Sequence, residues 1–152
     1  MKIGHAHLKV SDLEQSVTFY QTFFGLEITE MVASQFAFMS GGDMHHELAL
    51  QQVPIKREPE SHLQTGLYHI AFEVADYDEF ARAYYQLSSS GVQVTAVDHG
   101  ISWAMYFSDP DEHGLEIYLD RRHVNTGRDS WKGRSSRLNH DSLMETGQAV
   151  GV

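Results

Sequence analysis

Apolar and polar residues alternate along residues 3–10 with the period of two that is typical of a half-buried β-strand. Residues 13–24 then place apolar side chains three and four positions apart, which predicts an amphipathic helix. Asp12 suits the N-cap of this helix, and Gly25 suits its C-terminal end. Further strands are expected at residues 26–32, 35–39 and 46–51. The first third of the chain is therefore predicted to form a β-α-β-β-β unit.

The same order of elements begins again after a polar segment at residues 53–65, which we interpret as a connecting loop. The second set comprises a strand at 67–74, a helix at 77–88 and strands at 92–97, 102–107 and 115–119. At an offset of about 64 residues His69 aligns with His5, and at about 69 residues Glu116 aligns with Glu47. The chain therefore contains two copies of one unit, each with a histidine in its first strand and a glutamate in its last.

This repeat predicts an α+β fold in which two pseudo-twofold-related βαβββ modules form one open, curved, mixed sheet. We expect a single domain at residues 1–120, made of module one at 3–52, the loop at 53–65 and module two at 66–120. Residues 121–152 carry few large apolar side chains, so they are expected to form a polar C-terminal extension. The extension is predicted to be partly ordered to about Leu138 and loose beyond it.

Pairing of the modules would bring His5, His69, Glu116 and Glu47 to similar depths on the inner strand faces, so that the sheet surrounds a metal site. Two imidazoles and a carboxylate hold Fe(II) while leaving positions open for substrate and O₂. The same ligands suit Zn, Ni, Co or Mn, so the ligand types alone do not identify the metal. The alternative is that both histidines are hydrogen-bonded core residues that the repeat places alike for packing reasons.

Composition restricts the partners. The formal net charge of −10 argues against a nucleic acid or an anionic membrane as a partner, because phosphate binding needs a basic surface. The absence of cysteine excludes disulfides, cysteine-based zinc sites and thiol nucleophiles. No apolar run approaches the length of a signal sequence or a membrane span, so we expect a cytoplasmic protein.

A resemblance to the vicinal oxygen chelate superfamily is carried by three stretches, HAHLKVSDLEQSVTFYQTFFGLEI, YHIAFEV and YFSDPDEHGLEIY. This superfamily includes glyoxalase I, type I extradiol dioxygenases and the bleomycin- and fosfomycin-resistance proteins. The resemblance covers about residues 3–120 and implies paired βαβββ modules. It also implies that His5, His69 and Glu116 are the metal ligands.

Three further residues are similar to the extradiol dioxygenase branch. His99-Gly100 stands ahead of Tyr106 and an Asp-Pro turn, and the stretch HELAL beginning at His46 is similar to that family's His-Asp-x-Ala-Leu/Phe stretch. The resemblance implies that His46 is the acid/base histidine, that His99 lies near the substrate hydroxyl or ring, and that Tyr106 hydrogen-bonds the catecholate. The alternatives are that His46 and His45 form a solvated loop pair and that Tyr106 is a core residue.

The resemblance thus implies an Fe(II)-dependent extradiol ring-cleaving dioxygenase of aromatic catabolism, with Mn(II) as an alternative metal. Its partners would be O₂ and a small aromatic diol such as catechol or 2,3-dihydroxybiphenyl. We also expect a homo-oligomer, for example a dimer, because a small domain with exposed strand edges gains by pairing. The chain departs from the family in having one domain where many members have two, and in carrying Glu47 where Asp is commoner.

Two other functions remain open. A glyoxalase I-like metal-dependent lyase or isomerase would use Glu47 as a fourth ligand to Ni or Zn. A drug-binding resistance protein would hold no metal, and the complete set of His5, His69 and Glu116 speaks against it.

Overall fold

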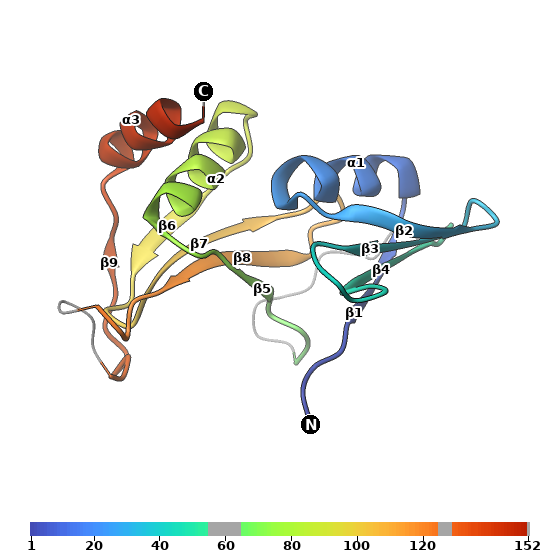
Figure 1. The fold of residues 1–152 in the computed structure, drawn as a ribbon, viewed down its shortest axis with the longest axis horizontal. Helices are drawn as coiled ribbons and strands as arrows, with labels where there is room; N and C mark the ends of the chain where they lie inside the picture. The colour runs from blue at the N-terminus through green and yellow to red at the C-terminus, as the bar shows by residue number, and fades with distance from the viewer. Residues whose placement is uncertain (55–64, 125–128, 152) are drawn as a thin grey trace. The chain divides into compact units, whose positions relative to one another are not determined.

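The computed structural model describes residues 1–54, 65–124 and 129–151, and most of the expected loop at 53–65 lies outside them. The chain divides into two compact units (Figure 1). Unit 1 comprises Met1–Gly66 together with the turn Asp109–His113, and unit 2 comprises Leu67–Ser108 together with Gly114–Val152. Within the described ranges, no helix is long and apolar enough to cross a bilayer.

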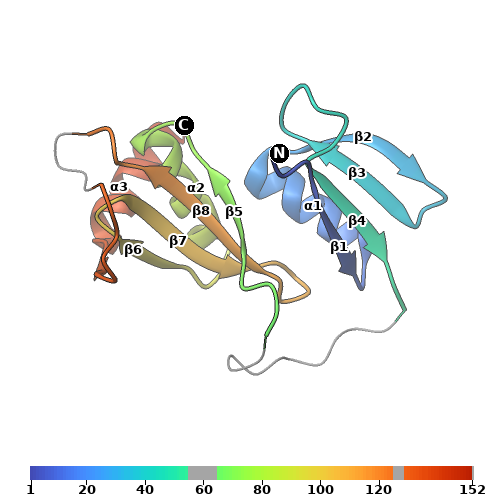
Figure 2. The same cartoon turned by 90° about the horizontal axis from the view of Figure 1, so that it is seen from below.

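Unit 1 has the predicted β-α-β-β-β order (Figure 2). Its elements are β1 (Ala6–Val10), α1 (Leu13–Phe24), β2 (Glu27–Val32), β3 (Phe36–Ser40) and β4 (Leu48–Gln52). The strands form a mixed sheet in the order β1-β4-β3-β2, in which β1 and β4 run parallel. The predicted helix caps are confirmed, because the Asp12 side chain accepts a hydrogen bond from the Gln15 N–H and Gly25 adopts a φ of 63°.

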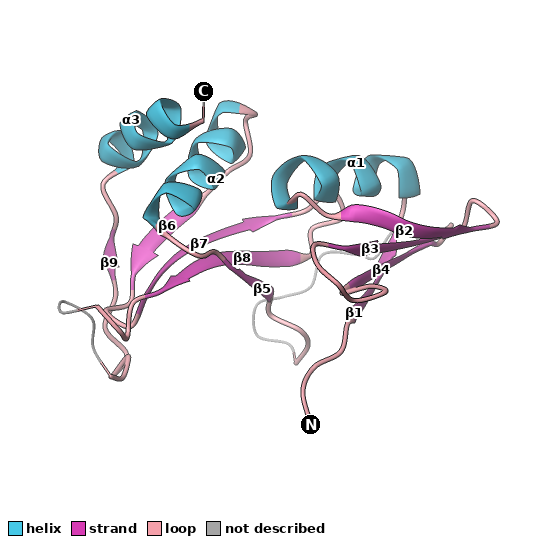
Figure 3. Cartoon of the chain, viewed as in Figure 1, coloured by secondary structure: helices cyan, strands magenta, loops and turns pink. Residues whose placement is uncertain are grey.

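Unit 2 repeats this arrangement and adds a strand and a helix to it (Figure 3). Its elements are β5 (Ile70–Glu73), α2 (Tyr77–Ser89), β6 (Thr95–Asp98), β7 (Ser102–Ser108), β8 (Gly114–Asp120), β9 (Ser136–Arg137) and α3 (His140–Val150). The sheet order is β5-β8-β7-β6-β9, with β5 and β8 parallel. The α+β class and the repeated module are confirmed. The described strands form two mixed sheets, one in each unit, where the sequence predicts one.

The C-terminal extension is more ordered than expected, because the segment after Leu138 forms α3 instead of a loose end. Asn139 caps this helix by accepting a hydrogen bond from the Ser142 N–H, and Leu143 is only 3% exposed. α3 packs along α2 (Figures 1 and 2). The few apolar residues of the extension are therefore sufficient to stabilise a helix, because α2 supplies the surface on which they are buried.

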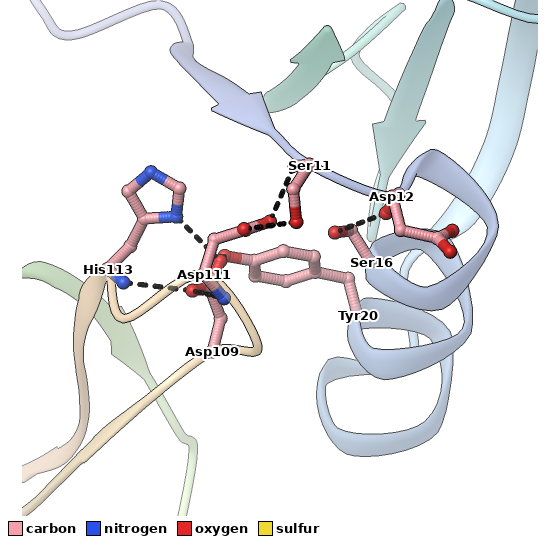
Figure 4. A network of polar contacts seen from close by, with 7 residues as sticks. All are labelled: Ser11, Asp12, Ser16, Tyr20, Asp109, Asp111 and His113. Carbon is pink, nitrogen blue, oxygen red and sulfur yellow. Dashed lines mark hydrogen bonds and ion pairs between the residues drawn. The ribbon is translucent and has the colours of Figure 1, made fainter. Parts of the chain in front are cut away.

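A network of polar contacts joins α1 to the turn Asp109–His113 in unit 1 (Figure 4). The Asp109 carboxylate, only 5% exposed, accepts hydrogen bonds from the Tyr20 hydroxyl at 2.9 Å and from His113 Nδ1 at 2.8 Å. The backbone N–H groups of Asp111 and His113 donate to its other oxygen. Burial alone would raise the pKa of Asp109, but the hydrogen bonds from His113 and Tyr20 outweigh it and lower the pKa.

We expect Gly147→Ala to destabilise the packing of α3 on α2. A Cβ at position 147 would lie 2.2 Å from the Ala81 carbonyl oxygen and 2.5 Å from the Tyr85 Cβ, so the helices would have to separate. Urea denaturation should show a loss of about 1–3 kcal/mol in the free energy of unfolding. Gly4→Ala is the matched control, because a Cβ at Gly4 meets no atom within 4 Å. Equal stability of the two variants would contradict this packing.

We expect Tyr20→Phe to lower the free energy of unfolding by about 1–3 kcal/mol, because it removes a donor from a buried carboxylate. The pKa of Asp109 is lowered from 3.8, so its contribution is present above about pH 3.8 and is lost as the pH falls through the folded-state value. Losing the Tyr20 donor raises that value, so acid unfolding, followed by circular dichroism, should begin at a higher pH. Ser11→Ala, which removes an exposed hydrogen bond to Asp111, should cost far less. Equal losses would mean that Tyr20 does not hold the carboxylate.

Candidate functional site

Unit 1 brings together His5 and His46, two of the residues that the sequence singles out. His5 directly precedes β1, and His46 lies two residues ahead of β4, the strand that pairs with β1. Their ring centroids are 4.5 Å apart, and the Phe38 ring lies 5.0 Å from that of His46. Desolvation, followed by the proximity of the other histidines, holds the pKa of His46 below its ordinary value.

His46 does contact its neighbour His45, as the alternative interpretation of a loop pair requires. The two Nδ1 atoms are 2.9 Å apart, and His45 Nε2 lies 3.3 Å from a carboxylate oxygen of Glu30. His45 is exposed, however, whereas His46 is half-buried against His5 and Phe38. The pair is therefore not simply solvated, and His46 is the member that contacts another predicted site residue, His5.

Unit 2 brings together His69, Tyr106 and Glu116. Glu116 lies in the middle of β8 and is only 9% exposed, and Tyr106 is its direct partner on β7 in the antiparallel register. The Tyr106 hydroxyl donates to Glu116 Oε1 at 3.2 Å. His69 directly precedes β5, the parallel neighbour of β8, and its Nε2 lies 2.8 Å from Glu116 Oε2. Both carboxylate oxygens of Glu116 are therefore contacted by residues that the sequence placed at the site.

His99 extends this arrangement. It follows the last residue of β6, and its Nε2 lies 2.9 Å from the Tyr106 hydroxyl. Tyr106 is thus hydrogen-bonded on both sides, by His99 and by Glu116. Burial, followed by the negative charge of Glu116, raises the pKa of Tyr106, so the phenol is protonated at neutral pH.

The contacts of His69 and Glu116 fit a divalent cation. Burying a carboxylate is costly unless a cation or several donors compensate it, and the partners of Glu116 among the described residues are a neutral phenol and an imidazole. His69 Nε2 and Glu116 Oε2 lie 2.8 Å apart, close enough to serve as a nitrogen and an oxygen ligand of one ion. Among the described residues no three His, Asp or Glu side chains form a metal-binding group. His5 belongs to unit 1, so its association with this pair stays a prediction.

Glu47, the repeat partner of Glu116, has a different environment. It is exposed, and its Oε2 accepts hydrogen bonds from the Gly41 N–H at 2.9 Å and from the Ser40 hydroxyl at 3.4 Å. Its carboxylate therefore stabilises the turn between β3 and β4. This engagement speaks against Glu47 as a fourth metal ligand.

Two residues near His99 were missed at the level of sequence. Ser135 Oγ lies 2.6 Å from His99 Nδ1, and the Trp131 ring stands edge-on to the His99 ring with centroids 5.6 Å apart. Both belong to the C-terminal extension, which the repeat does not include. The one available signal was Trp131 itself, a large aromatic residue in an otherwise polar segment.

Residues 2–117 match the family model of the Glyoxalase/Bleomycin resistance protein/Dioxygenase superfamily. A catechol-2,3-dioxygenase of Bacillus subtilis (strain 168) is 33% identical over 127 residues, which are 84% of this chain but only 44% of that relative. The glutathione transferase FosA of Serratia marcescens is 32% identical over 121 residues, 77% of this chain and 79% of that one. A solved glyoxalase/dioxygenase structure from Nostoc punctiforme has a TM-score of 0.65 at 28% identity and covers 79% of this chain and 91% of its own. With its two βαβββ modules and a family match over residues 2–117, the chain belongs to the glyoxalase/bleomycin resistance protein/dioxygenase superfamily, the vicinal oxygen chelate superfamily.

Proposed function

We propose that the protein is an extradiol dioxygenase that inserts O₂ into the ring of a catechol-type diol, with Fe(II) held by His5, His69 and Glu116. The observation that carries the proposal is the chain of contacts from His69 through Glu116 and Tyr106 to His99. A metal ligand, a protonated phenol and an imidazole side by side suit a substrate that is bound through two oxygens. The similarity to a catechol-2,3-dioxygenase supports the same choice.

Fe(II), when bound, would lower the pKa of a substrate hydroxyl and mediate electron transfer between the diol and O₂. The protein residues supply binding and proton transfer. Because the pKa of Tyr106 is raised, its hydroxyl stays protonated. Its one proton is donated to Glu116 Oε1 here, and it would turn to a deprotonated diol oxygen once Glu116 holds the metal. His99 holds that hydroxyl from the other side and fixes its orientation.

His46 is the proposed acid/base residue. Its pKa is lowered, so at neutral pH the imidazole is mainly unprotonated and is able to accept a proton from the substrate. The imidazolium formed in this way is then the donor that assists cleavage of the O–O bond.

A second candidate is a metal-dependent thiol transferase that acts on fosfomycin. It is supported by the similarity to the glutathione transferase FosA. The glyoxalase I-like alternative is weaker, since Glu47 is engaged by the β3–β4 turn. A metal-free drug-binding protein would leave the buried Glu116 without the cation that its position favours.

Oxygen consumption distinguishes these functions. Protein purified without air and loaded with Fe(II) should consume one O₂ per diol when given catechol or 2,3-dihydroxybiphenyl in air, and a yellow ring-opened product should accumulate. The same protein loaded with Zn(II) is the control and should consume none, because Zn(II) has no redox chemistry. If neither diol is consumed while fosfomycin and glutathione are, the thiol transferase is the correct function.

His46→Ala should retain the iron content of the parent protein while its turnover of diol falls by about 10²–10⁴-fold, the usual cost of removing an acid/base group. Iron is measured by metal analysis, and turnover by oxygen uptake. Glu116→Ala should instead lose iron and activity together. His123→Ala, which changes an exposed histidine in neither cluster, is the matched control. Loss of iron from His46→Ala would show that His46 is a ligand and not the proton-transfer residue.

A further inference from the structure

The C-terminal extension lies outside the matched family region, yet it contacts a residue of the candidate site. Ser135 Oγ is 2.6 Å from His99 Nδ1, and the Trp131 indole N–H donates to the same Ser135 oxygen at 3.2 Å. The Trp131 ring also meets the His99 ring edge-on, at an interplanar angle of 86°. The two residues therefore hold one edge of the imidazole by a hydrogen bond and cover it with an aromatic ring.

Strand pairing explains why Ser135 reaches His99. β9 pairs with β6 in an antiparallel register that sets Ser136 opposite Asp98 and Arg137 opposite Val97. Continuing that register by one residue sets Ser135 opposite His99. The Leu138 N–H donates to the Ala96 carbonyl at the other end of the short ladder, so hydrogen bonds hold β9 on β6 beyond the paired residues as well. The contact is thus a consequence of sheet register and not of an isolated side-chain rotamer.

The hydrogen-bond directions along this chain of residues follow from its ends. An ionised carboxylate only accepts, so the Tyr106 hydroxyl donates to Glu116 and its oxygen accepts from His99 Nε2–H. In a neutral imidazole the other nitrogen then carries no proton, so His99 Nδ1 accepts from the Ser135 hydroxyl. The indole N–H, which only donates, completes the series at the Ser135 oxygen. Tyr106, His99 and Ser135 therefore each donate one hydrogen bond and accept one within the series.

We propose that Ser135 and Trp131 are positioning residues that hold His99 with its Nε2–H directed at Tyr106, and that the C-terminal extension is thereby part of the diol-binding site. The role in diol turnover rests on the proposed dioxygenase function, whereas the orientation of His99 does not. Without Ser135 the ring of His99 loses the donor at Nδ1, and rotation or tautomer exchange becomes available to it. A ring turned in this way no longer holds the Tyr106 hydroxyl for the substrate.

Ser135→Ala tests this proposal by two readouts. In metal-free protein labelled with ¹⁵N-histidine, the parent should show a single Nε2–H tautomer for His99, and the variant should show a displaced Nδ1 resonance and averaging between tautomers. In iron-loaded protein, kcat for catechol should fall by about tenfold, the scale of one hydrogen bond, with the iron content unchanged. Ser135→Thr keeps the hydroxyl and should restore both readouts.

Ser136→Ala is the matched control, because the neighbouring side chain on a strand points to the opposite face. Trp131→Phe, which keeps an aromatic ring but removes the N–H, should give a smaller change of the same kind. His99 resonances in Ser135→Ala that are identical to those of the parent would overturn the proposal, whatever the activity. If the parent protein cleaves no diol, the proposed function fails, and the resonances alone decide the positioning of His99.

Discussion

The burial of the Glu116 carboxylate in the middle of β8 is the constraint on which the candidate site depends. Its neighbours along the strand, Leu115 and Ile117, are core residues, so the strand cannot shift to expose the carboxylate without exposing them. A buried carboxylate needs donors or a cation, and the structure supplies His69 on one oxygen and Tyr106 on the other. The buried charge of Glu116 thus explains why hydrogen-bonding side chains, His69 and Tyr106, lie on both sides of β8.

Sheet register meets this demand with residues that lie in the strands or directly beside their ends. β7 places Tyr106 directly opposite Glu116, and β5 brings His69 to the same end of β8. The same logic extends outward, since Tyr106 holds His99 and the ladder between β6 and β9 brings Ser135 to it. A site built on paired strands is well suited to precise positioning, because hydrogen-bonded strands move less than loops do.

Glu47 and Glu116 occupy equivalent positions in the two copies of the repeated unit but have different surroundings. Glu47 lies just before β4, is exposed and stabilises the turn that leads into that strand. Glu116 lies within β8, which begins two residues ahead of it, and is buried. A small difference in where the last strand begins therefore separates a turn-stabilising carboxylate from a candidate metal ligand. In unit 1 the first-strand histidine His5 instead lies against the ring of His46.

The sequence alone determined the two modules and the caps of α1, because periodicity and capping chemistry are local properties of a chain and the repeat shows the same unit twice. The repeat singled out His69 and Glu116 as candidate site residues, and the family resemblance singled out Tyr106 and His99. The sequence did not reveal that Asp109 is held by Tyr20, that Glu47 is engaged by a turn, or that Ser135 and Trp131 reach His99. These contacts join residues that no periodic pattern relates, and strand register and burial decide them only once the chain has folded. The helix α3 was missed for the same reason: its few apolar residues are insufficient for a helix in water and sufficient when α2 covers them.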